Sequence, residues 1–340
     1  MSTPSSTSAA LQLPPVIFLM GPTASGKTDL ALALAEQYPI EVISVDSALV
    51  YRGMDIGTAK PDHGFLQRLP HFLIDVCEPD EVYSVAQFRK DALALIASII
   101  DRGNVPLLVG GTMLYFKVLL EGIAEIPRIP EGIRESILNQ AERLGWPALH
   151  ERLREVDPVS AARIHPNHSQ RIQRALEVFE AFAEPLSAFH ARQQGQALPF
   201  RALQLCLDVP RDCLHQRIAL RFDAMIAKGF IDEVQQLRQD YELHQNMPSM
   251  RAVGYRQVWQ YLDGEISVEE LREQGCAATR QLAKRQLTWL RKWSDLHRIS
   301  GPLEIQSGVD PSTALQKQLA LIRPLCDQFH IPANRCVYNL

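Results

Sequence analysis

The chain has 340 residues, 46% of them hydrophobic, with a formal net charge of −4 and a pI near 6.2. This length and composition allow a large packed core, which excludes a disordered or fibrous protein and predicts one elaborated domain or two. The charge balance by itself predicts no partner, so binding to nucleic acid would have to come from local basic patches.

The six cysteines are scattered and include no C-x-x-C pair, which favours reduced thiols and a cytoplasmic protein. Cys326, His330 and Cys336 do not have the spacing of a zinc finger, so we expect no metal there. Residues 1–13 lack the basic segment of a signal peptide, and no stretch approaches the ~20 apolar residues of a membrane helix. We expect a soluble protein with no membrane partner and with monomer as its default state.

The first 120 residues alternate short β-rich runs with helical patterns, as expected for successive βα units of a parallel sheet covered by helices. Ser84 and Gln87 have the spacing of a capping box, and Gly103 is suited to end the helix that they begin. We predict strands over Val16–Met20, Glu41–Val45, His71–Val76 and Val105–Val109.

Between residues 121 and 200 the pattern changes to charged helical segments punctuated by prolines, which indicates a helical insertion. A strand over Ala202–Asp208 and a long helix carrying Arg217 and Arg221 then resume the sheet. Helical patterns continue to about residue 298, and residues 301–340 form a tail without a clear pattern. The predicted fold is α/β: a P-loop NTPase-like core of residues 14–120 and 201–300, with a parallel β-sheet flanked by helices, plus the helical insertion at 121–200.

The run Gly21-Pro-Thr-Ala-Ser-Gly26-Lys27-Thr28 fits G-x-x-x-x-G-K-[ST] and stands between the first strand and an amphipathic helix over Asp29–Gln37. In such a loop, backbone N–H groups converge on phosphate oxygens, the helix dipole favours an anion, and the lysine adds a full charge. The hydroxyl of Thr28 can ligate Mg²⁺. The predicted phosphate-binding residues are Gly21, Thr23, Ala24, Ser25, Gly26, Lys27 and Thr28.

A P-loop establishes a bound di- or triphosphate but not kinase or hydrolase chemistry. An ATPase of this class usually holds Mg²⁺ with an acid after a neighbouring strand, whereas the fourth strand here ends in Gly110-Gly111-Thr112. Asp46, after the second strand, is the only carboxylate so placed, and it could be a Mg²⁺ ligand, a turn cap or a base facing the phosphate site. A small-molecule or nucleoside kinase and a non-catalytic RNA-binding P-loop protein are the alternatives to an enzyme that uses this base.

Six motifs in order make residues 16–295 resemble the tRNA dimethylallyltransferases, also called tRNA isopentenyltransferases, of the bacterial type. The run from Asp46 to Pro61 is the longest of them, and Leu49 within it stands where many relatives have Gln. The other motifs are the P-loop, Gly110 to Tyr115, Asp157-Pro158 with Arg163 to Asn167, Arg251 to Arg256, and Arg280 to Gln286.

The resemblance implies transfer of a dimethylallyl group from dimethylallyl diphosphate to the exocyclic N6 amine of the tRNA adenosine at position 37, next to the anticodon. It implies that the P-loop holds this diphosphate rather than ATP, and that Asp46 is the base that accepts a proton from the adenine. Lys27, Mg²⁺ and Arg221 would stabilise the leaving diphosphate, and Thr112 would hydrogen-bond in the channel. From the residues alone, Thr112 is also suited to cap a helix, and Arg217 with Arg221 to form a solvated helix face.

Basic segments fit an RNA partner. Residues 280–298 carry six Lys or Arg against one Asp, a local charge of +5, interleaved with Trp289 and Trp293. A solvated helix with both Trp side chains in the core would have the same composition. The resemblance assigns tRNA contacts to Asp46, Ser47, Ala48, Leu49, Thr112, Arg134, Gln170, Arg171, Ile172, Gln173, Arg174, Arg251, Ala252, Val253, Gly254, Tyr255, Arg256, Lys284, Arg285, Gln286, Leu287, Thr288, Trp289, Leu290 and Arg291.

The resemblance also implies that the insertion contacts the anticodon arm of the tRNA. The histidines of the insertion lack metal-ligand spacing, and we interpret them as surface or RNA-facing groups. They are His150, His165, His168 and His190.

Overall fold

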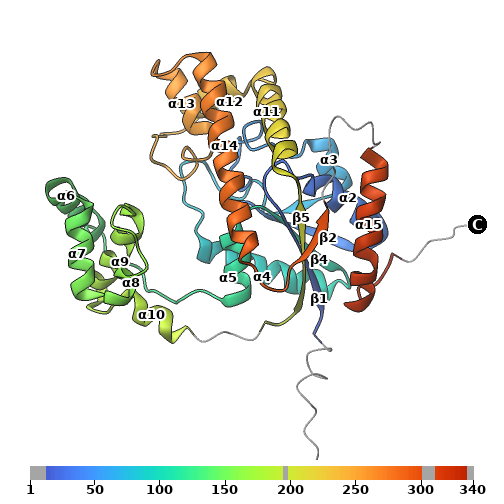
Figure 1. Ribbon diagram of the computed structural model, residues 1–340, viewed down its shortest axis with the longest axis horizontal. Coiled ribbons are helices and arrows are strands. Elements are labelled where there is room, and N and C mark those ends of the chain that lie inside the picture. Colours follow the sequence, from blue (N-terminus) through green and yellow to red (C-terminus); the bar gives the residue numbers. More distant parts are fainter. Residues whose placement is uncertain (1–12, 194–197, 301–310, 335–340) are drawn as a thin grey trace, which may run out of the picture. The chain divides into compact units, whose positions relative to one another are not determined.

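The computed structural model describes residues 13–193, 198–300 and 311–334. Packing divides the chain into two units (Figure 1). The core unit takes in Met1–Leu119 and Leu198–Leu340, and the insert unit takes in Leu120–Ala197. Within the described ranges, no helix has the length and apolar content needed to cross a bilayer.

The core unit is built on one six-stranded sheet, in the order β3-β2-β4-β1-β5-β6, and all neighbouring strands in it are parallel. This confirms the predicted α/β class with a parallel sheet flanked by helices. The strands are β1 (Pro15–Met20), β2 (Ile40–Val45), β3 (His71–Phe72), β4 (Val105–Gly110), β5 (Arg201–Asp208) and β6 (His297–Ser300). The helices of this unit are α2 (Lys27–Gln37), α3 (His63–Arg68), α4 (Val85–Asp101), α5 (Met113–Glu121), α11 (Arg211–Ala227), α12 (Phe230–Asp240), α13 (Tyr255–Leu262), α14 (Val268–Arg291) and α15 (Pro311–Gln328).

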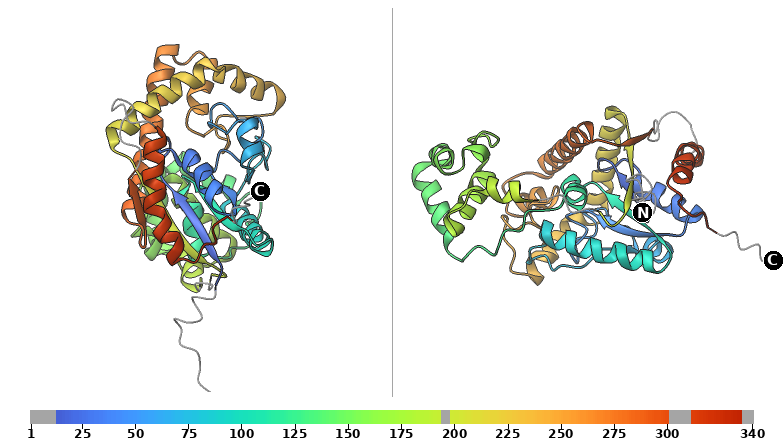
Figure 2. Two further views of the ribbon diagram at one scale, coloured as in Figure 1. Left: turned by 90° about the vertical axis from the view of Figure 1, so that its right-hand side faces the viewer. Right: turned by 90° about the horizontal axis from the view of Figure 1, so that it is seen from below.

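The two faces of the sheet are covered by different helices because side chains alternate along each strand. On β1, Ile17 and Leu19 belong to the hydrophobic cluster that includes α2 and α15. Phe18 points to the other face, where its ring lies 5.1 Å from that of Phe116 on α5. Figures 1 and 2 show α15 beside α2, and the two helices are in contact. The C-terminal helix is therefore part of the core unit.

The third strand is shorter than the sequence predicts. The apolar pattern predicts a strand over His71–Val76, but β3 ends at Phe72. Leu73 and Asp75 have left-handed backbone conformations, with φ of 63° and 55°, which regular strand pairing does not allow. The prediction is wrong beyond Phe72, and the following residues hydrogen-bond instead to the segment after β2.

Two elements near the C-terminus differ from the sequence prediction. The helical pattern predicts helix to about residue 298, yet α14 ends at Arg291, and β6 pairs with β5 at the edge of the sheet. Only Ile299 of the four β6 residues is buried, so this strand has almost no hydrophobic pattern. The predicted tail contains α15, whose Ile322 and Cys326 are buried in the core.

The carboxyl ends of β2, β4 and β1 lie side by side at one edge of the sheet. β1 leads into the P-loop, β4 ends at Gly110, and β2 ends one residue before Asp46. In open parallel sheets, ligands bind outside this edge, at the point where the order of the strands reverses. β1 is such a point, because the chain leaves it for β2 on one side and later forms β5 on the other.

The insert unit is made of helices around a hydrophobic core of its own, with Leu153 and Leu176 fully buried at its centre. His150 belongs to this core: it is 4% exposed, and its Nε2 lies 2.8 Å from the Ile164 carbonyl oxygen. The interpretation of His150 as a surface or RNA-facing group is therefore wrong, because α7 turns it inward. The other histidines of the insertion, His165, His168 and His190, are exposed. The helices are α6 (Ile133–Leu144), α7 (Trp146–Val156), α8 (Pro158–Ala161), α9 (Ser169–Phe182) and α10 (Leu186–Arg192).

Asp157 is a fully buried acid of the insert unit, and its contacts are structural. Its Oδ1 accepts a hydrogen bond from the Ser160 N–H at 3.0 Å, and its Oδ2 accepts one from the Ser187 N–H at 3.0 Å. Burial disfavours the charged carboxylate, but these bonds outweigh burial and hold the pKa of Asp157 below its usual value. The Asp157-Pro158 motif thus caps α8 and joins it to the start of α10.

Candidate active site at the carboxyl edge of the sheet

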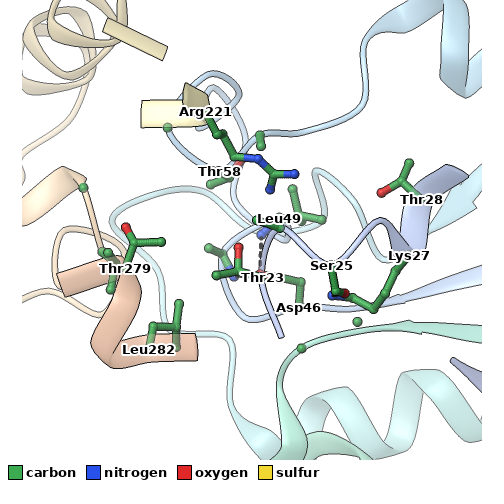
Figure 3. A pocket seen from close by; sticks show the side chains of 18 of the residues that line it. Thr23, Ser25, Lys27, Thr28, Asp46, Leu49, Thr58, Arg221, Thr279 and Leu282 are labelled. Carbon is green, nitrogen blue, oxygen red and sulfur yellow. Dashed lines mark hydrogen bonds between the residues drawn. The ribbon is translucent and has the colours of Figure 1, made fainter. Parts of the chain in front are cut away.

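A cavity of about 410 Å³ lies at the carboxyl edge of the sheet in the core unit. The P-loop, the segment after β2, the turn after β4 and residues of α11, α13 and α14 form its walls. Figure 3 shows Ser25, Lys27 and Asp46 grouped on one side, and Arg221 next to Thr58. Polar groups that converge beside apolar side chains are typical of small-molecule sites.

The P-loop makes a tight turn between β1 and α2. Gly26, with φ of 91°, is the N-cap of α2, and Ala24 also has a positive φ, of 62°. Small residues accept this conformation at the lowest cost. The N-terminus of α2 therefore faces the cavity, where its free N–H groups and dipole favour a phosphate. Of the predicted phosphate-binding residues, Thr23, Ala24, Ser25, Gly26, Lys27 and Thr28 line the cavity, whereas Gly21 is not in its wall.

Lys27 is held by its own loop. Its Nζ donates to the carbonyl oxygens of Gly21 and Pro22, at 2.9 and 2.7 Å. Burial, and then the positive charge of Arg221, lowers the pKa of Lys27 to about 8, while the charge of Asp46 opposes the shift. A phosphate bound in the loop would supply further negative charge beside this ammonium and would favour its charged form.

Asp46 has one structural oxygen and one free oxygen. Its Oδ1 accepts hydrogen bonds from the N–H groups of Ala48 and Leu49, at 2.8 and 3.4 Å, which closes the turn after β2. No hydrogen bond from the described part of the chain reaches Oδ2. The turn-cap interpretation therefore accounts for one oxygen only, and Oδ2 is available to a ligand in the cavity that Asp46 lines.

The glycines after β4 allow β2 and α14 to lie close against this turn. A Cβ at Gly110 would lie 2.0 Å from the Val45 carbonyl oxygen, and one at Gly111 would lie 2.3 Å from Nε2 of Gln286. The structure shows that β2 and α14 occupy the space that their missing side chains leave.

Thr112 supports the residue next to Asp46. Its Oγ1 accepts a hydrogen bond from the Ser47 N–H at 3.1 Å, and its own N–H donates to the Val45 carbonyl at 3.2 Å. Thr112 thus connects the turn after β4 to the end of β2. Its hydroxyl makes this connection. The Thr112 side chain therefore does not cap α5, which the residues alone would allow.

Gln286 joins the P-loop to the turn after β4. Its Oε1 accepts a hydrogen bond from the Thr23 N–H at 2.9 Å, and its Nε2 donates to the Gly111 carbonyl at 2.8 Å. The residue is only 8% exposed. Both ends of the amide thus support the cavity that Gln286 also lines, and its assignment to tRNA stays a prediction. Helical spacing alone places this residue on an inward face but gives no sign of its partners.

Arg221 lines the cavity from α11, whereas Arg217, one turn earlier, is not in its wall. Desolvation lowers the pKa of Arg221, Asp29 opposes this shift, and Arg217 adds to it. A guanidinium stays charged despite such a shift. Lys27 and Arg221 thus bring two positive charges to one cavity.

The residues assigned to tRNA by resemblance range from exposed to fully buried. Ile172 and Leu290 are fully buried, and Gln173 is buried beside Glu177. Tyr255 is buried as well, in a hydrophobic cluster of the core unit. These four side chains are not at the surface, and of them Tyr255 lines the cavity, so a tRNA contact at these positions stays a prediction. The exposed residues are Ser47, Arg134, Gln170, Arg171, Arg174, Arg251, Arg256, Lys284, Arg285, Thr288, Trp289 and Arg291.

The two tryptophans of the basic segment have different environments. Trp289 is 37% exposed, and the Lys117 ammonium lies 5.7 Å from its ring centroid. The indole N–H of Trp293 donates to the Gln204 side chain at 2.7 Å, which ties the end of α14 to β5. Trp289 alone of the two presents an aromatic side chain at the surface.

Thr28 is the residue predicted to ligate Mg²⁺, and it lies in the wall of the cavity. Over the described ranges, no group of three or more His, Cys, Asp or Glu side chains could hold a metal ion. Mg²⁺ often keeps several waters and binds one or two protein groups together with substrate phosphates, so a single hydroxyl beside a bound diphosphate fits. Of the tail cysteines, Cys326 is buried and Cys336 lies outside the described residues.

The fold and the site define a class of protein. A P-loop opens at the carboxyl edge of a parallel sheet, two cations face its cavity, and Asp29 and Asp46 bring carboxylates to its walls. The turn after β4 has glycines where a P-loop ATPase has its Mg²⁺-binding acid. The protein is thus a P-loop α/β protein with a cavity in which the phosphate-binding motif, two cationic side chains and carboxylates meet.

Comparison with known proteins identifies the family. A family model described as IPP transferase matches residues 49–293. The tRNA dimethylallyltransferase of Thiobacillus denitrificans is 59% identical over 287 residues, which cover 84% of this chain and 91% of that protein. The tRNA dimethylallyltransferase 2 of Hahella chejuensis is 56% identical over 302 residues, with 85% and 91% covered.

Solved structures agree with this result. The tRNA isopentenylpyrophosphate transferase of Bacillus halodurans is 34% identical, with a TM-score of 0.67 and coverage of 94% of this chain and 98% of that one. A eukaryotic dimethylallyltransferase acting on tRNA is 26% identical, with a TM-score of 0.78 and coverage of 95% and 81%. The chain belongs to the tRNA dimethylallyltransferase family, also called the IPP transferase family.

We predict that the affinity of the protein for inorganic diphosphate falls as the pH rises through about 8. Below that pH Lys27 is an ammonium that attracts the anion, and above it the neutral amine adds no charge. Calorimetric titrations across this range measure the effect. The Lys27→Met variant should bind more weakly at neutral pH and should follow only the ionisation of the ligand. The same pH dependence in both proteins would contradict the role of Lys27.

Proposed function

We propose that the protein transfers a dimethylallyl group from dimethylallyl diphosphate to the exocyclic N6 amine of the tRNA adenosine next to the anticodon. The observation that carries this proposal is the free Oδ2 of Asp46 in the same cavity as the P-loop and Arg221. A base and a diphosphate site in one cavity suit a reaction in which an amine displaces a diphosphate. Membership of the family supports the identity of donor and acceptor.

The arrangement of the P-loop supports binding of the donor. On binding, the Lys27 ammonium exchanges its bonds to the Gly21 and Pro22 carbonyls for bonds to phosphate oxygens. The side chains of Met225 and Leu282 line the same cavity and suit the hydrocarbon part of the donor. One site thus offers both the charge and the apolar surface that a prenyl diphosphate requires.

The geometry of Asp46 supports its role as the base. The N–H of Ala48 fixes Oδ1, so the orientation of the carboxylate is set and Oδ2 can take the proton of the N6 amine. As the bond between the amine nitrogen and the allylic carbon forms, the bond from that carbon to the diphosphate oxygen breaks, and its electron pair leaves with the diphosphate. A placed base contributes about 10²- to 10⁴-fold to such a step.

Positive charge from the protein supports departure of the diphosphate. Lys27 and Arg221 both face the cavity and can stabilise the negative charge that builds up on the leaving group. The family suggests a need for a divalent metal, and we assign this role to Mg²⁺, held by the Thr28 hydroxyl and the diphosphate. Bound there, the ion would add further charge stabilisation.

Exposed basic residues in both units support contacts with tRNA. Positive side chains on one helix face neutralise phosphates, and an exposed tryptophan can stack on an unpaired base. In the core unit this set comprises Arg251, Arg256, Lys284, Arg285 and Arg291 with Trp289, and in the insert unit it comprises Arg134, Arg171 and Arg174. We propose that each unit contacts the RNA and that the insert unit contacts the anticodon arm.

The Asp46→Asn variant separates the two roles of the carboxylate. The amide oxygen can still accept from the Ala48 N–H, so the turn after β2 should be kept, but the base is lost. We expect kcat for dimethylallyl transfer to fall by about 10²- to 10⁴-fold, while the affinity for tRNA stays within about twofold. Single-turnover assays and filter binding measure both quantities. Near-normal kcat in this variant would remove Asp46 as the base.

Variants of α14 test the proposed RNA surface. Lys284→Ala with Arg291→Ala should weaken binding of an anticodon stem-loop and lower the slope of log K against log salt by about 0.7 for each phosphate that the protein no longer neutralises. Lys317→Ala on α15 removes one exposed charge from another helix and serves as the control. An unchanged slope in the double variant would mean that this basic face is only solvated.

A further inference from the structure

A further carboxylate, that of Glu233, holds one wall of the cavity in place. Oε2 of Glu233, on α12, accepts hydrogen bonds from the N–H groups of Asp55 and Ile56, at 3.0 and 2.6 Å. Oε1 accepts from the Gly57 N–H at 3.1 Å and from the Tyr255 hydroxyl at 2.6 Å. Three consecutive N–H groups that converge in this way form an anion-binding nest, and here a side chain of the protein fills it.

The segment that Glu233 holds is also fixed by packing and by its own bonds. A Cβ at Gly57 would lie 2.0 Å from the Phe230 ring, so the backbone here lies directly against α12. The Thr58 hydroxyl donates to the Met54 carbonyl at 2.7 Å. At the end of the segment, the buried ammonium of Lys60 pairs with two carboxylates, those of Asp55 and Asp75.

This segment separates two cavities of the core unit. Gly57 and Thr58 line the cavity that holds the P-loop and Asp46. Ile56 and Lys60 line a neighbouring cavity of about 630 Å³, whose other walls include charged side chains such as Lys228. Ala59, Pro61, Arg221 and Met225 line both cavities. A charged cavity holds water, and residues 55–61 with the side chains beside them stand between that water and the reaction cavity.

We propose that Glu233 is a positioning residue that keeps residues 55–61 in place as a wall, and that this wall limits the access of water to the allylic carbon of the donor. The inference rests on the proposed dimethylallyl transfer. Closed active sites prevent the capture of reactive groups by water. Glu233 touches neither substrate in this account and acts only through the backbone N–H groups that it binds.

Loss of the wall has a defined chemical consequence. Water would compete with the adenine amine: its oxygen would bond to the allylic carbon as the bond from that carbon to the diphosphate oxygen breaks. The electron pair of that bond leaves with the diphosphate, and the water gives up one proton to solvent. The products are dimethylallyl alcohol and diphosphate, with no change in the tRNA.

Glu233→Gln is the variant of choice because it keeps the shape of the side chain. Its NH₂ group must replace either Oε1 or Oε2, and in both orientations it then faces at least one backbone N–H of residues 55–57, donor against donor. Asp232→Asn is the matched control. It makes the same change of charge one residue earlier on α12, at an exposed position.

The experiment follows labelled dimethylallyl diphosphate in the presence of Mg²⁺ and unmodified tRNA, and it measures the ratio of dimethylallyl alcohol to prenylated adenosine. This ratio does not depend on how much of the protein is folded. We expect it to rise about tenfold in Glu233→Gln and to stay within about twofold of the wild type in Asp232→Asn.

Two results would overturn the inference. One is a fall in turnover of Glu233→Gln with an unchanged ratio, which would make Glu233 a purely structural residue. If this variant does not fold, Thr58→Val removes a hydrogen bond of the same wall, and an unchanged ratio there overturns the inference equally. Failure of the wild type to prenylate the tRNA would instead refute the proposed function.

Discussion

The pair of hydrogen bonds made by Gln286 holds together the parts from which the cavity is built. One end of its amide binds the Thr23 N–H in the P-loop, and the other binds the Gly111 carbonyl after β4. The carboxyl ends of two neighbouring strands are thereby fixed to α14, the helix that also carries the exposed basic residues. The Gln286 amide occupies the space that a side chain at Gly111 would need, so only glycine fits there. A change at either position would move the P-loop relative to Asp46.

The charged side chains Lys27, Arg221 and Asp46 lie together in the wall of this cavity. Lys27 and Arg221 are positive, both are partly deprived of water, and the pKa of each is lowered in consequence. An anionic substrate such as the proposed diphosphate would relieve this cost. Asp46 stands beside the same cations with one oxygen fixed and one free. Glu233 is not in the wall of the cavity itself. In the proposal it acts through the backbone N–H groups of residues 55–57, which it binds.

Elements with a strong local signal could be predicted from the sequence, and elements that depend on distant partners could not. β1 and β4 have continuous apolar runs, β2 and β5 have apolar residues interrupted by a few polar ones, and the P-loop motif predicts the phosphate site. β6 has one buried residue, and the early end of β3 follows from left-handed turns that no periodicity reveals. The roles of Gln286 and Glu233 depend on partners 175 and 176 residues away, and helical spacing shows only that a face is buried. The resemblance assigns Ile172 and Leu290 to tRNA because its motifs mix surface and core positions.

In the proposed reaction, this cavity brings a prenyl diphosphate together with an adenine of tRNA. The most direct measurement incubates the purified protein with Mg²⁺, unmodified tRNA and either labelled dimethylallyl diphosphate or labelled ATP, and then locates the label in the digested RNA by mass spectrometry. We expect label from dimethylallyl diphosphate on the N6 nitrogen of the adenosine next to the anticodon, and none from ATP. Phosphate transfer or hydrolysis from ATP without prenylated adenosine would contradict it.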